Sequence, residues 1–154
     1  PQVLSNLLWA AWGINRSDPG KRTAPSASNR QEIEIYAAMA DGLYLYDAKT
    51  HALKGVLAAD LRAATGNQEF VGQAPLNLVY VADLSRMGGG DPQRHAMTLG
   101  ADTGFIAQNV YLFCASERLA TVVRGLVDRE KLAQAMKLRP DQRITYSQTV
   151  GYPR

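Results

Sequence analysis

The chain has 154 residues, 46% of them hydrophobic and 20% charged, which fits one globular domain with a buried core. Its net charge of +3 is too small and too scattered to predict a nucleic-acid partner, and no apolar run reaches the roughly 18 residues that a membrane-spanning helix needs. The single cysteine, Cys114, excludes a disulfide within the chain and argues against a cysteine-based metal site. We expect a cytoplasmic protein, or a periplasmic one if a longer precursor carries a signal peptide.

The first residues have the spacing of an amphipathic helix. Leu4, Leu8 and Trp12 fall on one helical face, which predicts a helix over residues 1–12 that stops at Gly13. Because the chain begins inside this helix, we expect a further segment to precede it.

The other elements follow from hydrophobic periods and turn residues. They are expected as a polar loop over 14–24, a helical turn opened by Pro25 with Ser26 as its cap, strands over 32–39, 43–46 and 51–57, a short helix over 60–65, a strand over 76–82, a flexible loop over 86–94, a helix over 96–118, an extended piece over 120–123, a helix over 128–138 capped by Asp128, and a strand over 143–150. Asp41-Gly42 marks a tight hairpin turn, and the apolar run 76–82 is typical of a strand buried on both faces.

Hairpin strands followed by a helical half predict a single α+β layer domain over residues 1–154. The helices over 1–12 and 96–118 carry more apolar surface than one small sheet can cover. We therefore expect a second copy of the chain to bury the surplus.

Conventional catalytic sites find little support. His51 and His95 lie far from other ligands or nucleophiles in sequence, which argues against a metal site and a Ser-His-Asp triad. Cys114 lies among apolar helix residues and is interpreted as core. The glycines over 88–90 lack the residues of a phosphate-binding loop. If the protein is an enzyme, a cofactor should carry the chemistry, although binding modules also lack catalytic sets.

Four segments, in the same order, resemble the nitroreductase family. Residues 22–31, RTAPSASNRQ, resemble its R-x-A-P-S-x-x-N-x-Q segment, and residues 104–112 resemble its G-x-x-x-Q-N-x-x-L helix. Residues 118–125 are similar to G-L-x-T-V-x-x-G, with Arg118 in place of the first glycine, and 150–153 resemble the terminal G-Y-P strand. The branch that looks most similar contains small dehydrogenases related to thiazoline and oxazoline oxidases.

The resemblance implies a mixed, mostly antiparallel sheet flanked by helices, assembled as an intertwined homodimer. It also implies an FMN-dependent oxidoreductase with flavin at the dimer interface. Hydride would pass from NADH or NADPH to the flavin, and then to a small-molecule acceptor such as a nitroaromatic or quinone, in a ping-pong reaction. Neither nucleic acid nor a membrane is implied as a partner. Two alternatives stay open, a dehydrogenase of a peptide thiazoline or oxazoline and a non-catalytic flavin-binding protein.

The resemblance also implies the cofactor-binding residues, with no catalytic side chain and no metal, since the flavin carries the chemistry. They are Pro25, Ser26, Ala27, Asn29, Asn67, Gln68, Val123, Arg124, Gly125 and Arg154. Backbone amides beside Ser26 and Asn29 suit flavin oxygens, although both residues could simply cap the turn. Gly125 would let the main chain approach the ring, with its amide near the atom that accepts hydride.

Charge near the flavin is less defined by the sequence. Arg124 could favour the anionic reduced flavin or be a surface arginine, and Arg154 could bind the phosphate. Arg16, Lys21 and Arg22 concentrate positive charge that a small anion could use. The family's R-R-S-x-R segment, which holds the FMN phosphate, has no match here, and Glu32-Ile33 replaces its usual Pro-Trp.

Overall fold

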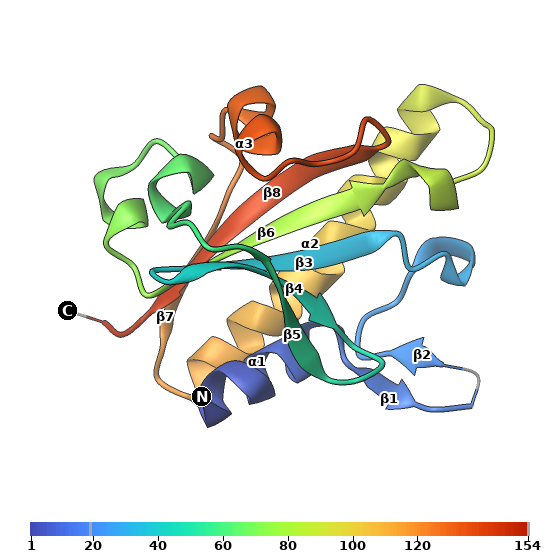
Figure 1. Cartoon of the computed structure of the whole chain (residues 1–154). Coiled ribbons are helices and arrows are strands. Elements are labelled where there is room, and N and C mark those ends of the chain that lie inside the picture. Colours follow the sequence, from blue (N-terminus) through green and yellow to red (C-terminus); the bar gives the residue numbers. More distant parts are fainter. Residues whose placement is uncertain (19, 154) are drawn as a thin grey trace.

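A six-stranded sheet in the order β5-β4-β3-β6-β8-β7 forms the centre of the fold in a computed structural model that describes residues 1–18 and 20–153 (Figure 1). Every described pairing in it is antiparallel. The strands are β3 (Ile33–Met39), β4 (Gly42–Asp47), β5 (Ala52–Leu57), β6 (Leu76–Asp83), β7 (Ala120–Arg124) and β8 (Gln142–Gly151). The predicted hairpin is confirmed, since Met39 pairs with Gly42 across the turn, and so is the central strand, since every residue of β6 is buried.

Helices cover both faces of the sheet. They are α1 (Gln2–Trp12), α2 (Pro92–Ser116) and α3 (Arg129–Ala135). Between α1 and α2 the chain also forms four 3-10 turns, η1 (Ala27–Asn29), η2 (Arg62–Thr65), η3 (Glu69–Gly72) and η4 (Leu84–Arg86). In the described part of the chain, none of these helices is long and apolar enough to cross a membrane.

The side chains of β6 show why the fold has three layers. Successive residues of a strand point to opposite faces. Leu78 and Tyr80 belong to the larger core under α1 and α2, whereas Val79 and Val81 belong to the smaller core under α3. The α+β class predicted from the sequence is therefore confirmed, with a sheet buried on both faces.

Three local predictions need correction. The loop predicted over 14–24 contains a two-stranded hairpin of β1 (Ile14–Arg16) and β2 (Lys21–Arg22), which is too short to show a hydrophobic period. The loop predicted over 86–94 ends earlier, because the Asp91 side chain accepts a hydrogen bond from the backbone of Gln93 and begins α2. The turn η3 was not predicted, and α3 ends at Ala135, three residues short of its predicted end at Leu138.

Candidate functional site

The turn over residues 25–29, called the 25–29 turn below, has an unusual backbone. Ser28 and Asn29 have φ values of 55° and 53°, in the left-handed region that small polar residues tolerate better than most. The exposed side chain of Asn29 accepts a 3.0 Å hydrogen bond from Nε2 of Gln31 through its Oδ1. The turn therefore presents Asn29 and the exposed ring of Pro25 at the surface.

Two buried carboxyl groups contact the same turn from inside. The Ser26 hydroxyl accepts a hydrogen bond from the backbone of Gln31 at 2.8 Å and donates one to Oε2 of Glu32 at 3.2 Å. The backbone N–H of Ala27 donates to Oδ2 of Asp102, on α2, at 2.9 Å. Ser26 does occupy the N-cap position of η1, but its side chain makes no capping bond, so the predicted role of its hydroxyl is wrong.

A cavity of about 390 Å³ opens beside the 25–29 turn. Its lining contains three cations and no carboxylate, and consists of Arg16, Lys21, Arg22, Thr23, Ala24, Pro25, Ser26 and Asn29. The positive residues that the sequence suggested for a small anion therefore lie next to the turn that carries the family resemblance. Such a cavity attracts anions electrostatically.

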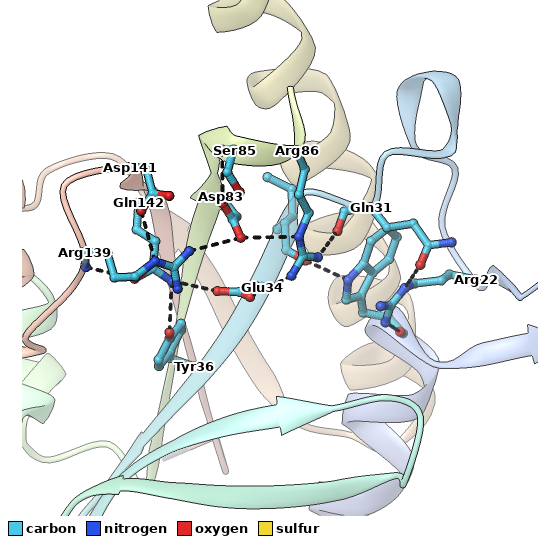
Figure 2. Close-up of polar contacts among 12 residues, drawn as sticks. Arg22, Gln31, Glu34, Tyr36, Asp83, Ser85, Arg86, Arg139, Asp141 and Gln142 are labelled. Carbon is cyan, nitrogen blue, oxygen red and sulfur yellow. Dashed lines mark hydrogen bonds and ion pairs between the residues drawn. The ribbon is translucent and has the colours of Figure 1, made fainter. Parts of the chain in front are cut away.

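Arg22 connects the β1–β2 hairpin to the rest of the molecule. Its Nε donates to Oε1 of Gln31 at 2.7 Å, its Nη1 donates to the carbonyl of Trp12 at 2.9 Å, and its guanidinium lies 4.6 Å from the Trp12 ring centroid. Figure 2 shows Arg22 directed at the side chain of Gln31. The backbone carbonyl of Gln31 accepts a separate hydrogen bond from Nη1 of Arg86 at 2.8 Å. Burial lowers the pKa of Arg22. These contacts fix the end of the turn to α1 and η4.

A second group of predicted residues gathers around Arg124, at the end of β7. This side chain is only 4% exposed, which rules out the surface arginine that the sequence left open. Nη1 donates to the Thr65 carbonyl at 2.8 Å and Nη2 to Oδ1 of Asn77 at 3.1 Å, while Nε is buried without a partner. Burial lowers the pKa of Arg124, and no salt bridge among the described residues compensates its charge.

The loop after η2 packs against this arginine. A Cβ on Gly66 would lie 1.7 Å from Nη1 of Arg124, so the close approach requires glycine. The predicted residues Asn67 and Gln68 follow directly; Asn67 is exposed, and Oε1 of Gln68 is buried without a hydrogen-bond partner. We call Thr65, Gly66, Asn67, Gln68, Arg124 and Gly125 the Arg124 cluster.

Gly125 gives this cluster an open backbone. It is exposed, and a Cβ built on it would meet only the ring of Tyr146, at 3.4 Å. The N–H of Val123, another predicted residue, donates instead to the Tyr111 hydroxyl at 2.9 Å. Arg154, predicted as a phosphate ligand, lies outside the described residues.

Within one chain, the 25–29 turn and the Arg124 cluster lie far apart. The 25–29 turn lies beside the β1–β2 hairpin at one end of the molecule, whereas η2, η3 and the end of β7 lie at the other (Figure 1). The residues implied by the resemblance thus form two built surfaces, one at each end of the sheet.

The residues set aside from the sequence have ordinary surroundings. His51 lies 2.8 Å from the Ser5 hydroxyl and 3.0 Å from the Tyr46 hydroxyl, which confirms a hydrogen-bonded role. Cys114 is buried, and burial raises the pKa of its thiol to about 11, which fits a core residue. Residues 1–18 and 20–153 contain no group of three potential metal ligands.

Sequence reasoning missed Glu32 and Asp102. A signal existed for Asp102, which lies three residues after Leu99 and four before Ile106, on the buried face of α2. A charged residue on an apolar helical stripe indicates a buried polar contact. Glu32 gave no such signal, because it stands at a strand end where polar residues are common.

Comparison with known proteins identifies the family. The sequence profile of the nitroreductase family matches residues 1–152. A Methanocaldococcus jannaschii protein, provisionally named a nitroreductase, is 30% identical in an alignment 146 residues long, which covers 88% of this chain and 73% of that protein.

Solved structures agree with this match. The crystal structure of a provisionally named nitroreductase from Ralstonia eutropha is 47% identical with a TM-score of 0.94, covering 99% of this chain and 73% of that one. A Desulfovibrio desulfuricans protein, likewise provisionally named a nitroreductase and solved in complex with FMN, shares the fold at 19% identity and a TM-score of 0.68, with 99% and 73% coverage. The chain described here belongs to the nitroreductase family, a family of oxidoreductases.

Proposed function

We propose that this protein is an FMN-dependent oxidoreductase that takes hydride from NADH or NADPH and reduces a nitroaromatic, a quinone or a similar organic acceptor. The observation that carries the proposal is the pair of surfaces described above. Each contains residues that the family resemblance implies for the flavin site, yet the two surfaces lie at opposite ends of one chain. A second copy of the chain would bring the 25–29 turn of one subunit to the Arg124 cluster of the other.

The residues of the Arg124 cluster fit a flavin. Arg124 is a buried cation without a carboxylate partner in the described chain, and Nε of Arg124 and Oε1 of Gln68 have unused hydrogen-bonding capacity. A flavin edge offers both acceptors and a donor, and its reduced form is an anion. The open backbone at Gly125 leaves room for a planar ring.

Exposed apolar side chains on the two long helices support a homodimer. Trp9 of α1 is 46% exposed, and Phe105 and Leu112 of α2 are 46% and 62% exposed. The helices α1 and α2 pack together on one face of the sheet, where these apolar side chains remain exposed. Large exposed apolar patches mark interfaces.

Each part of the chain has a separate role in the reaction. A bound flavin would accept hydride and pass it on, which supplies the redox chemistry. Arg124 would stabilise negative charge that develops at the ring, the cluster would orient its polar edge, and Asn29 would contribute a hydrogen bond from the partner. The cations Arg16, Lys21 and Arg22 suit the phosphates of a nucleotide. A reduced nicotinamide donor favours a cytoplasmic setting.

Anaerobic mixing with NADH and NADPH tests the reaction. We expect the flavin absorbance of the FMN-loaded protein to bleach with at least one of them, and to return when a quinone or nitroaromatic is added. Bleaching by a peptide thiazoline or oxazoline, but by neither nicotinamide, would instead identify the dehydrogenase alternative. A flavin that none of these compounds reduces would indicate a non-catalytic binding protein.

A further inference from the structure

Beneath the 25–29 turn lies a pair of buried carboxyl groups without a counter-ion. Glu32 has 0% and Asp102 3% of its surface exposed. The described residues include no salt bridge to either group. Two isolated carboxylates in such a place would repel one another at a high cost in free energy, so both cannot be charged together.

The hydrogen bonds differ between the two carboxyl groups. Asp102 accepts the backbone N–H of Ala27, which is favourable for a carboxylate. Oε1 of Glu32 is buried, and in an ionised carboxylate, which can only accept hydrogen bonds, this atom has no partner among the described residues. Glu32 and Asp102 contact adjacent residues, Ser26 and Ala27, so the two carboxyl groups are neighbours. A proton on Glu32 turns one of its oxygens into a donor, for which Asp102 is a neighbouring acceptor.

The pKa of Glu32 is shifted in the direction that favours its protonated form. Burial raises its pKa above the ordinary value of 4.5, and the hydrogen bond and charge of Asp102 raise it further, whereas its backbone and the Ser26 hydroxyl lower it.

Other charged groups near the pair are engaged elsewhere. On η4, Arg86 pairs with Glu34 at 3.1 Å and with Asp83 at 3.3 Å, and Asp83 also pairs with Arg139 at 3.1 Å (Figure 2). From β6, only the backbone N–H of Asp83 meets the Glu32 carbonyl, at 2.9 Å.

On the other sides, too, no residue within 1–18 or 20–153 forms an ion pair with either carboxyl group. Arg22, the last residue of β2, is bound to Gln31 and to the Trp12 carbonyl. The α2 residue next to Asp102 is Thr103, whose hydroxyl meets that of Thr145 on β8 at 2.9 Å.

We propose that Glu32 and Asp102 are positioning residues that share one proton and together hold the 25–29 turn in the conformation the site requires. Glu32 holds the Ser26 hydroxyl, and Asp102 holds the neighbouring Ala27 amide. Loss of the shared proton places two negative charges side by side and releases the turn. The effect on flavin binding rests on the proposed function, whereas the shared proton and the turn geometry do not.

The presence of the shared proton can be tested on the protein without bound flavin. Infrared spectra of the wild-type protein at neutral pH are expected to contain a carboxylic-acid band that E32Q lacks and that the control E130Q, at an exposed position of α3, keeps. Because the pKa of Glu32 is raised on folding, its contribution to stability is full below pH 4.5 and is lost as pH rises. The stability of E32Q relative to wild type should therefore increase with pH. If E32Q keeps the carboxylic-acid band and its stability relative to wild type does not change with pH, Glu32 and Asp102 do not share a proton.

The positioning role is tested by hydrogen exchange and FMN titration. We expect D102A to expose the Ala27 amide to exchange and to weaken FMN binding about tenfold, the effect of losing one charge-assisted hydrogen bond. Wild-type affinity should fall at high pH by at most about tenfold per pH unit, the limit for one proton, while E32Q, whose amide can still donate to Asp102, should lose this dependence.

The outcomes separate the two proposals. If wild type binds FMN but D102A and E32Q leave exchange at Ala27, affinity and its pH profile unchanged, the positioning role is wrong. If wild type binds no FMN, the proposed function fails, and the infrared and exchange results still decide the role of the pair.

Discussion

Replacing Gly66 with alanine is expected to lower the free energy of unfolding by about 2–3 kcal/mol, the usual range for overpacking a buried site. The new Cβ would lie 1.7 Å from Nη1 and 3.0 Å from Cζ of Arg124. The guanidinium cannot move aside freely, because it is bonded to Thr65 and Asn77. Displacing it would leave a buried charge with fewer partners, and the site would lose its shape.

Urea unfolding with Gly100→Ala as the control measures this effect. Gly100 lies within α2, and a Cβ there would meet nothing within 4 Å. That substitution should stabilise the protein by about 1 kcal/mol, because alanine favours a helix over glycine. Equal stability changes in the two variants would show that the Gly66–Arg124 contact is not the constraint described here.

Truncating Trp12 to alanine should cost about 3–5 kcal/mol, as is typical for a large buried aromatic residue. Its side chain is 2% exposed, and its Nε1 donates to the Ile33 carbonyl at 2.8 Å. The ring also lies against Arg22, 4.6 Å from the guanidinium. The substitution therefore separates α1 from β3 and loosens the cationic hairpin, at a cost comparable with the whole stability of many domains.

Trp9 provides the matched control on the same helix. It is 46% exposed, so Trp9→Ala should change the unfolding free energy of the monomer by about 1 kcal/mol or less. The Trp9→Ala and Trp12→Ala variants are compared by thermal unfolding at several protein concentrations. Similar losses for Trp9 and Trp12 at low concentration would contradict the burial described.

Elements with a clear period could be predicted from the sequence. The helix ending at Trp12, the Asp41-Gly42 hairpin and the apolar β6 strand were each specified by local pattern and turn chemistry. The β1–β2 hairpin could not be, since strands of two or three residues carry no period. The start of α2 was missed because its first turn is polar and exposed, and only the Asp91 cap marks it.

The candidate site was predictable as a set of residues but not as a shape. Matching motifs pointed to Asn29 and Gly125, but no local pattern indicates that Arg124 is buried or that Gly66 packs against it. Those contacts join segments that are distant in sequence. The separation of the 25–29 turn from the Arg124 cluster also follows only from the sheet topology.

Co-expression of Asn29→Ala with Gly125→Val tests most directly whether two chains build each flavin site. Each variant alone should retain little FMN, because every site in its dimer carries one defect. In the mixed dimer, the intact turn of one subunit meets the intact Gly125 of the other, so one site is restored. We predict that tagged mixed dimers recover the flavin absorbance of one of the two sites. Mixed dimers as empty as both parents, or FMN bound at full stoichiometry by a wild-type monomer, would contradict the account.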